Sequence, residues 1–286
     1  MGDMLPSNLL STLETPLGAK PSHLRPLSGG CVGEVYGLEA GGERYALKVD
    51  RRHGGALAVE GRMLDYLAQR TALPAPRAVA YDDGYLLMTW VEGGSGGGDE
   101  LHAADLLAEL HDLSADAYGF EFDTVIAALH QPNPWTPRWL DFFAEQRVVE
   151  MAKQAFDAGN LPGELLRRAE RLAGRLSDWL EEPVRPGLVH GDVWSGNVMG
   201  RGGRITGFLD PALYFADPEV ELAFITLFST FGDAFFRRYA ERRGLSPQFW
   251  DTKRALYNLY PLLVHARLFG GGYVSQAGSI LRRFVG

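Results

Sequence analysis

Cysteine is almost absent from this chain of 286 residues. Cys31 is the only one, so no disulfide can form within the chain and a metal site built on paired cysteines is excluded. Long apolar runs are also missing, because the longest uncharged apolar stretch, residues 222–228, is far too short to cross a bilayer. Residues 1–10 lack the basic flank and the apolar segment of an export signal. We therefore expect a cytoplasmic protein with no membrane partner.

Positive charge is in deficit. The chain has 28 Lys and Arg residues against 36 Asp and Glu residues, which gives a net charge of −8 and a pI near 5.4. A negative field argues against nucleic acid as a partner, because nucleic acids bind through their phosphate backbone, and it mildly favours amine-bearing substrates. The apolar content of 46% is enough for one large core or two lobes. The composition is therefore typical of a folded globular chain.

The residues that carry chemistry concentrate in one stretch, residues 190–197, which reads HGDVWSGN, and in Asp210 thirteen positions after Asn197. Asp192 is predicted to lie in a loop and to take the proton of a substrate hydroxyl as the catalytic base. The amide oxygen of Asn197 and the carboxylate of Asp210 are hard ligands that suit Mg²⁺, and a hairpin between them returns the chain to the same place. This spacing predicts phosphoryl transfer from Mg-ATP.

Two neighbours of Asp192 have alternative interpretations. His190 is interpreted as a packed side chain that holds the loop, in preference to a catalytic role. Trp194 is either a core aromatic or a ring that stacks on the face of a sugar, and the sequence leaves both open. An isolated His-Gly-Asp is most often only a turn, so the kinase hypothesis depends on three correctly spaced elements.

The pattern along the chain divides it into two unlike parts. Short apolar runs between residues 27 and 92 predict an antiparallel sheet of about five strands, interrupted by one helix over residues 56–69. Glycine dominates residues 93–98, which predicts a flexible linker. We therefore expect an N-lobe over residues 1–92, including an N-terminal helix, a linker over 93–99 and a helical C-lobe over 100–286. Helices are predicted over 101–113, 136–155, 163–180, 218–231 and 248–269.

The N-lobe carries a candidate nucleotide site. Lys48 is flanked by apolar residues on a predicted strand and can reach the α- and β-phosphates of ATP. Glu60, twelve residues further on in the predicted helix, is the natural ion-pair partner of Lys48. The simpler alternatives are a solvated lysine and an exposed helical glutamate.

Two further segments complete the predicted ATP site. A glycine-rich turn lets backbone N–H groups approach phosphate oxygens closely, although such hairpins are mostly only turns. The strand before the linker is interpreted as a hinge whose backbone binds the adenine edge, although an ordinary buried strand is the alternative. The residues concerned are Gly29, Gly30, Cys31 and Val32 in the turn and Met88, Thr89, Trp90 and Val91 in the hinge.

These residues resemble the fructosamine kinase (ketosamine-3-kinase) family of small-molecule kinases. The resemblance implies an α+β, bilobal, protein-kinase-like fold and ATP-dependent phosphorylation of the C3 hydroxyl of a ketosamine, free or protein-linked. It implies Asp192 as the base, Asn197 and Asp210 as Mg²⁺ ligands, and Trp194 and His265 as substrate-binding residues. It extends over residues 29–31, 110–111, 131–135, 190–197, 210–212, 217–223 and 259–273.

Three rival functions differ in what they require of the sequence. An aminoglycoside or choline-type amino-alcohol kinase would keep every residue on the ATP side and change only the pocket of the C-lobe. A protein kinase is disfavoured, because Glu219 follows Asp210 by only nine positions and leaves no room for a long activation segment. A catalytically inactive pseudokinase is disfavoured because Lys48 and the three catalytic-loop and metal residues are all present.

Cys31 supports a separate expectation about the state of the protein. A thiol in a phosphate-binding turn lies among N–H dipoles that favour the thiolate, so it can be oxidised. As the only cysteine, it could pair only with a second molecule. We expect a monomer, or a redox-dependent dimer through Cys31, with a small apolar filler as the alternative role of this residue.

Overall fold

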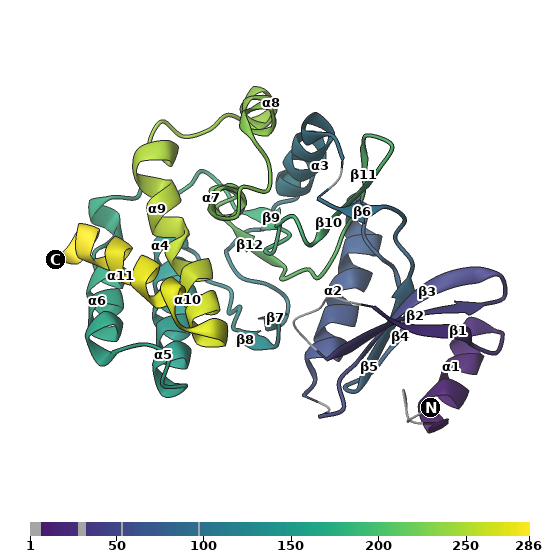
Figure 1. Cartoon of the computed structure of the whole chain (residues 1–286). Coiled ribbons are helices and arrows are strands. Elements are labelled where there is room, and N and C mark those ends of the chain that lie inside the picture. Colours follow the sequence, from purple (N-terminus) through teal and green to yellow (C-terminus); the bar gives the residue numbers. More distant parts are fainter. Residues whose placement is uncertain (1–6, 28–32, 53, 97) are drawn as a thin grey trace.

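The computed structural model describes residues 7–27, 33–52, 54–96 and 98–286, and it has two lobes of different construction (Figure 1). The N-terminal lobe is built on a five-stranded antiparallel sheet in the order β1-β2-β3-β5-β4. Its elements are α1 (Ser7–Leu17), β1 (Ser22–Leu27), β2 (Glu34–Ala40), β3 (Glu43–Val49), α2 (Ala56–Arg70), β4 (Ala78–Tyr81) and β5 (Tyr85–Thr89). Strands β2 to β5 and the single helix between them agree with the sequence prediction, whereas β1 lies before the range in which strands were expected.

The sheet is covered on both faces, because successive side chains of its strands point to opposite faces and apolar ones lie on each. On β5, Leu87 packs in one apolar cluster with Leu13 of α1, whereas Leu86 and Met88 pack in another cluster with Leu57 of α2. Helices α1 and α2 therefore lie on opposite faces, and α2 lies on the face that is turned to the other lobe (Figure 1). This packing fixes α2 beside β3, which carries Lys48.

The glycine-rich segment is not an unpaired linker. Gly94–Ser95 forms a short strand, β6, which pairs with β10 (Val198–Arg201), and β10 pairs in turn with β11 (Arg204–Phe208). The N–H of Gly96 also donates to the carbonyl of Val198 at 2.9 Å. The segment expected to be flexible is thus hydrogen-bonded to the hairpin that follows the catalytic loop.

The rest of the chain is mainly helical. The sequence prediction missed two helices, α8 and α11, and the hairpin β7–β8. It also predicted continuous helices over 136–155 and 248–269, where the structure contains π-helical turns, η1 and η3. The elements are α3 (Glu100–Asp112), β7 (Thr124–Ile126), β8 (Leu129–Gln131), α4 (Trp139–Phe142), η1 (Phe143–Val149), α5 (Glu150–Asp157), α6 (Gly163–Ala173), η2 (Leu176–Asp178), β9 (Gly187–Val189), β12 (Tyr214–Ala216), α7 (Glu219–Leu227), α8 (Asp233–Arg243), η3 (Phe249–Lys253), α9 (Arg254–Tyr257), α10 (Leu259–Phe269) and α11 (Gly272–Val285).

The main hydrophobic core crosses from one lobe into the other. Met63 and Leu67 of α2 and the following Leu73 belong to the same buried cluster as the aromatic residues of the helical lobe. The N–H of Leu213 also lies 3.3 Å from the sulfur of Met63. The lobes are therefore joined through α2 as well as through the glycine-rich segment.

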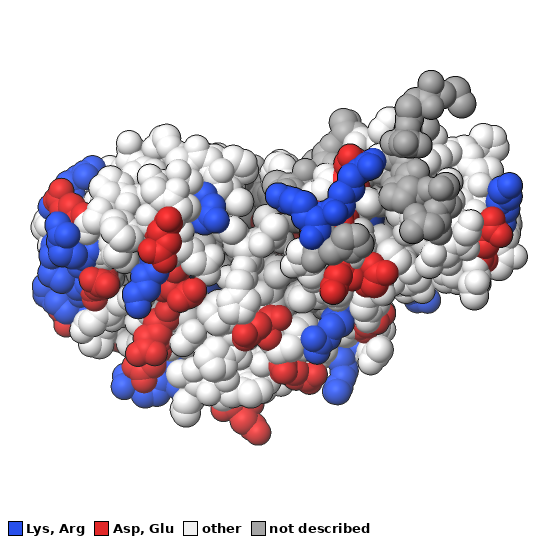
Figure 2. All heavy atoms as spheres, turned by 90° about the horizontal axis from the view of Figure 1, so that it is seen from below, with Lys and Arg blue, Asp and Glu red and all other residues white. Residues whose placement is uncertain are grey.

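The surface and the helix lengths bear on possible partners. On the face shown in Figure 2, acidic and basic side chains are interspersed between broad uncharged areas. Within the described residues, no helix combines the length and the apolar character needed to span a bilayer.

Gly93 tests the pairing of the glycine-rich segment. Its φ is +127°, and a Cβ atom there would lie 2.4 Å from the carbonyl oxygen of Gly200. We expect Gly93→Ala to lower the free energy of unfolding by about 1 to 3 kcal/mol and to raise the KM for ATP, because Val91 of the predicted hinge lies two residues before it.

The matched control is Gly94→Ala, since Gly94 has an ordinary φ and open space around its Cα. Thermal unfolding and initial-rate kinetics of both variants measure the difference. If Gly93→Ala unfolds at the wild-type temperature and keeps the wild-type KM for ATP, the close approach of Gly93 to Gly200 does not contribute to stability or to ATP binding.

Candidate active site

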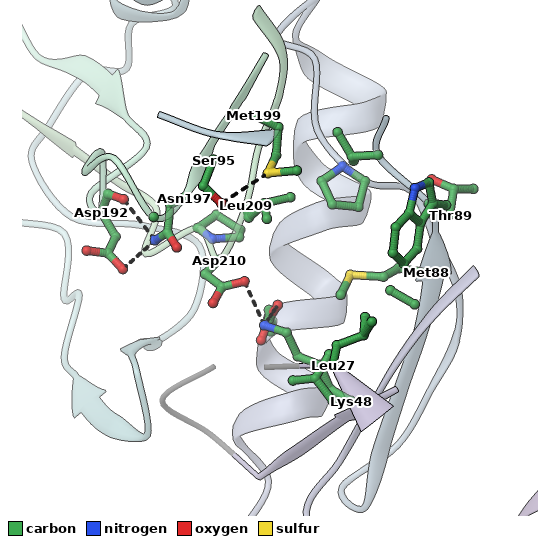
Figure 3. A pocket seen from close by; sticks show the side chains of 18 of the residues that line it. Leu27, Lys48, Met88, Thr89, Ser95, Asp192, Asn197, Met199, Leu209 and Asp210 are labelled. Atoms are coloured by element: carbon green, nitrogen blue, oxygen red, sulfur yellow. Dashed lines mark hydrogen bonds and ion pairs between the residues drawn. The ribbon is translucent and has the colours of Figure 1, made fainter. Parts of the chain in front are cut away.

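A cavity of about 480 Å³ lies between the sheet of the N-lobe and the hairpin β10–β11 (Figure 3). It brings together side chains that are far apart in the chain, since Lys48 and Asp210, 162 positions apart, meet in it. The predicted site residues that line it are Lys48, Glu60, Met88, Thr89, Trp90, Val91, Asp192, Trp194, Asn197 and Asp210. Gly29, Gly30, Cys31 and Val32 lie outside the described residues, and His265 does not line this cavity.

Lys48 is the electrostatic centre of the cavity. Its Nζ lies 2.7 Å from a carboxylate oxygen of Glu60 and 2.7 Å from one of Asp210. Burial disfavours the ammonium, but the two carboxylates outweigh burial and raise the pKa of Lys48 above its usual range. Lys48 is therefore a permanent cation that joins β3, α2 and the segment after β11.

Asp192 and Asn197 form the second polar cluster (Figure 3). The side-chain N–H₂ of Asn197 donates to the carboxylate of Asp192 at 2.8 Å and to its main-chain carbonyl at 3.1 Å. Burial and the nearby carboxylate of Asp210 raise the pKa of Asp192 to about 8. A carboxylate in this environment is a stronger base than a solvated one, which suits proton abstraction from a hydroxyl.

Asp210 is held by an unusual backbone conformation. Its φ is +56°, in the left-handed region that residues with a side chain seldom adopt, and such conformations persist where their surroundings enforce them. The N–H of Leu209 donates to the carbonyl of Asn197 at 2.8 Å, and the N–H of Ala212 donates to the carbonyl of His190 at 2.8 Å. The two loops that carry Asp192 and Asp210 therefore support each other.

Gly191 makes this close approach possible. Its φ is +87°, and a Cβ atom on it would lie only 2.2 Å from the carbonyl oxygen of Ala212. Only glycine meets both conditions at this position. The glycine of the His-Gly-Asp sequence is therefore required by the contact with the second loop.

The arrangement fits a bound Mg²⁺. The two hydrogen bonds that Asn197 donates use its nitrogen, which leaves its amide oxygen as the atom available to a cation. One oxygen of Asp210 contacts Lys48 and the other remains. No group of three or more acidic, His or Cys side chains in the described parts of the chain forms a closed metal site. An ion that takes few protein ligands and keeps phosphate oxygens and water, as Mg²⁺ does, matches this donor set.

The other half of the cavity is apolar. Ala46 on β3 and Met88 on β5 are paired across the sheet, and Leu27, Val35 and Leu209 complete the apolar surface. Val125 and Ala127, from the hairpin β7–β8 that the sequence did not predict, also line the cavity. A slot of this kind suits the faces of a planar base, with the backbone of residues 89–91 at its edge.

Glu221 is a functional residue that sequence reasoning missed. Its buried carboxylate accepts from the N–H of Gly191 at 2.6 Å and from that of His190 at 3.3 Å. It also contacts Nε2 of His111 at 2.9 Å, and Nδ1 of His111 contacts the hydroxyl of Tyr239 at 2.7 Å. Burial opposes the charge of Glu221, but His111 outweighs burial and lowers its pKa. Glu221 therefore anchors the backbone of the catalytic loop.

A signal for Glu221 was available in the sequence. Glu221 lies between Val220 and Leu222 in a mostly apolar helix, α7, and a buried carboxylate must have partners. Such a carboxylate needs a buried hydrogen-bond donor as its partner. The spacing of residues does not identify this partner, because His111 lies 110 positions earlier in the chain.

The two alternatives left open beside Asp192 are now distinguished. His190 is fully buried and its Nδ1 accepts from the N–H of Asp192 at 3.4 Å, in agreement with the packing role. Trp194 is 38% exposed and lines the cavity, so it is not a core aromatic. His265 lies on α10 within a group of aromatic rings that begins at Trp194.

The fold and the site together define the class of protein. An antiparallel N-lobe with a Lys–Glu ion pair, joined to a helical lobe that supplies two acids and an amide from successive loops, is the architecture of a protein-kinase-like phosphotransferase. A crystal structure of a Thermobifida fusca protein, named as a candidate fructosamine-3-kinase, superposes with a TM-score of 0.85 and 26% identity over 97% of this chain and 98% of that one.

Residues 7–286 match the sequence profile of fructosamine kinase, and the chain belongs to the fructosamine kinase family. It is 35% identical over 271 residues to a probable ketoamine kinase of Synechocystis, covering 91% of this chain and 89% of the other. It is 30% identical over 272 residues to the chloroplastic protein-ribulosamine 3-kinase of Oryza sativa, covering 91% and 78%. The predicted bilobal kinase-like fold and the predicted class of enzyme are confirmed.

Glu221→Gln tests the anchor of the catalytic loop. The substitution keeps the size of the side chain but replaces one carboxylate oxygen with an N–H₂ group. That group cannot accept a hydrogen bond, so the contact with either Gly191 or His111 is lost. We expect kcat to fall by about 10- to 100-fold, because the loop that carries Asp192 is displaced, with a much smaller change in the KM for ATP.

Tyr239→Phe is the control. It removes the hydroxyl that contacts His111 but keeps the hydrogen bonds of Glu221 to His111 and Gly191. Steady-state kinetics and circular dichroism are measured on both variants. A folded Glu221→Gln protein with wild-type kcat would show that the loop does not depend on this carboxylate.

Proposed function

We propose that the protein transfers the γ-phosphoryl group of ATP to the C3 hydroxyl of a ketosamine, the adduct that forms when a sugar condenses with an amine and rearranges. The observation that carries the proposal is the convergence of Lys48, Asp192 and Asp210 in one cavity, in a chain of the fructosamine kinase family. The names of the Synechocystis and rice relatives support a ketosamine as acceptor.

Three groups of the cavity have separate roles in this reaction. The base of ATP occupies the apolar slot beside Met88, and Lys48 contacts the α- and β-phosphates. Asp192 orients the acceptor hydroxyl and takes its proton as the new oxygen–phosphorus bond forms and the bond to ADP breaks. The raised pKa of Asp192 matches this role, because its carboxylate holds a proton more readily than a solvated one.

Charge supports Mg²⁺ as the companion of ATP. Lys48 is one positive group between two carboxylates, Glu60 and Asp210, so the polar half of the cavity carries excess negative charge. A bare triphosphate would be repelled there, and a dication removes the repulsion. Asn197 and Asp210 would hold the ion, which when bound neutralises phosphate charge and aligns the γ-phosphoryl group.

The product, a ketosamine 3-phosphate, is chemically unstable. Once C1 and C2 of the ketosamine enolise, the phosphate on C3 is eliminated and leaves an imine at C1. Water hydrolyses this imine and releases the amine. The enzyme would therefore reverse glycation of amines. The cytoplasmic location and the redox-dependent dimer through Cys31 stay predictions.

A substrate panel tests the acceptor. We expect ATP-dependent turnover, measured by coupled ADP detection, with the fructosamine and ribulosamine adducts of lysine and not with kanamycin or choline. Asp192→Asn should reduce kcat by at least about 100-fold with little change in ATP binding. Turnover of kanamycin in the absence of ketosamine turnover would replace the proposal with an aminoglycoside kinase.

Magnesium titration tests the metal ligands. We expect chelation to abolish activity and Asp210→Asn to raise the half-saturating Mg²⁺ concentration by at least about tenfold, because a charged ligand is lost. Ser95→Ala is the control, since Ser95 lines the cavity and its hydroxyl donates to the sulfur of Met199. An unchanged Mg²⁺ requirement in Asp210→Asn would remove this residue from the metal site.

A further inference from the structure

A continuous series of aromatic rings leads away from the active site, which we call the aromatic strip. It consists of Trp194, Phe228, His265, Phe269 and Tyr273. The ring centroids are 6.5 Å apart for Trp194–Phe228, 5.0 Å for Phe228–His265 and 5.8 Å for His265–Phe269. Tyr273 lies 4.9 Å from His265 and 6.2 Å from Phe269. The rings come from the catalytic loop, the end of α7, α10 and α11.

The first ring of the strip belongs to the catalytic cavity. Trp194 lines that cavity together with Asp192. Its indole lies over Gly196, where a Cβ atom would be only 2.2 Å from the ring. The turn after Phe228 is tied to the same loop, because the hydroxyl of Thr230 donates to the carbonyl of Val193 at 3.3 Å. The junction between strip and active site is therefore fixed by contacts on both sides.

The strip is accessible at both ends. Trp194 is 38% exposed at the cavity and Phe269 is 60% exposed at the far end, while the rings between them are half-buried. Large aromatic side chains bury most of their surface in a folded core, so two exposed ones at the ends of a contiguous series leave ring faces free for a ligand.

His265 makes the strip receptive to a hydrogen-bond donor. Its Nδ1 lies 2.8 Å from the carbonyl oxygen of Pro261, which can only accept, so Nδ1 carries the proton. Nε2 is then an acceptor in the neutral ring. Burial lowers the pKa of His265 below its usual value, so the ring does not repel a cation. Ring faces and a lone pair both favour an ammonium group.

We propose that the aromatic strip binds the amine half of the substrate, with the protonated secondary amine over the rings nearest Trp194 and the alkyl chain of the amine running toward Phe269. This inference rests on the proposed function, which places the sugar at Asp192. The amine is attached at C1 of the sugar, close to the reacting C3 hydroxyl, so it leaves the cavity on the side of Trp194. The strip thus selects ketosamines of long primary amines, such as a lysine side chain.

Two substrates with the same sugar separate the strip from the reaction centre. One is the fructosamine of methylamine, which ends near Trp194, and the other is the fructosamine of Nα-acetyl-lysine, whose chain reaches further. We expect Phe269→Ala to lower kcat/KM for the lysine adduct roughly fivefold through KM and to leave the methylamine adduct unchanged. Phe156→Ala is the matched control, because Phe156 is a similarly exposed aromatic residue on α5, outside the strip.

The proposal is tested by comparing the effect of Phe269→Ala on the two adducts. A selective loss for the lysine adduct in Phe269→Ala supports the proposal. If the wild-type enzyme phosphorylates both adducts but Phe269→Ala affects them equally, or affects neither, the strip proposal is overturned and the proposed function stands. If the wild-type protein phosphorylates neither adduct, the proposed function fails, and the strip has no ketosamine to bind.

Discussion

The pairing of one buried ammonium with two carboxylates is the constraint on which the rest of the site depends. Lys48 contacts Glu60 from the same lobe and Asp210 from the other. Removing the ammonium would leave two carboxylates without their shared partner, and an uncompensated buried charge costs about 3 to 5 kcal/mol. Lys48 therefore links α2 of one lobe to the loop that carries Asp210 in the other.

The residues of the reaction centre could be predicted from the sequence because their chemistry is local. The separation of Asp192, Asn197 and Asp210 spans a loop and one hairpin, whose geometry is short-range. Lys48 and Glu60 are also close in the chain, on a strand and the following helix. The short apolar runs of the N-lobe identified β2 to β5, since a strand that is covered on both faces is apolar along its length.

The features that escaped prediction depend on contacts between distant segments. Glycine content alone made residues 93–98 look flexible, whereas their pairing depends on a strand 104 positions away. The anchor at Glu221 requires His111, 110 positions earlier. The positive φ of Asp210 is enforced by surrounding loops and has no signature in composition. Spacing within a motif contains none of this information.

The burial of α2 has a consequence for control of the enzyme. Met63 and Leu67 are almost fully buried in the core shared with the other lobe. Swinging this helix outward, a common way to switch kinases off, would expose both side chains at a cost of about 1.5 to 3 kcal/mol each. The Lys48–Glu60 pair is thus a constitutive part of the architecture. Flux through such a catalyst follows the supply of its acceptor and the amount of protein present.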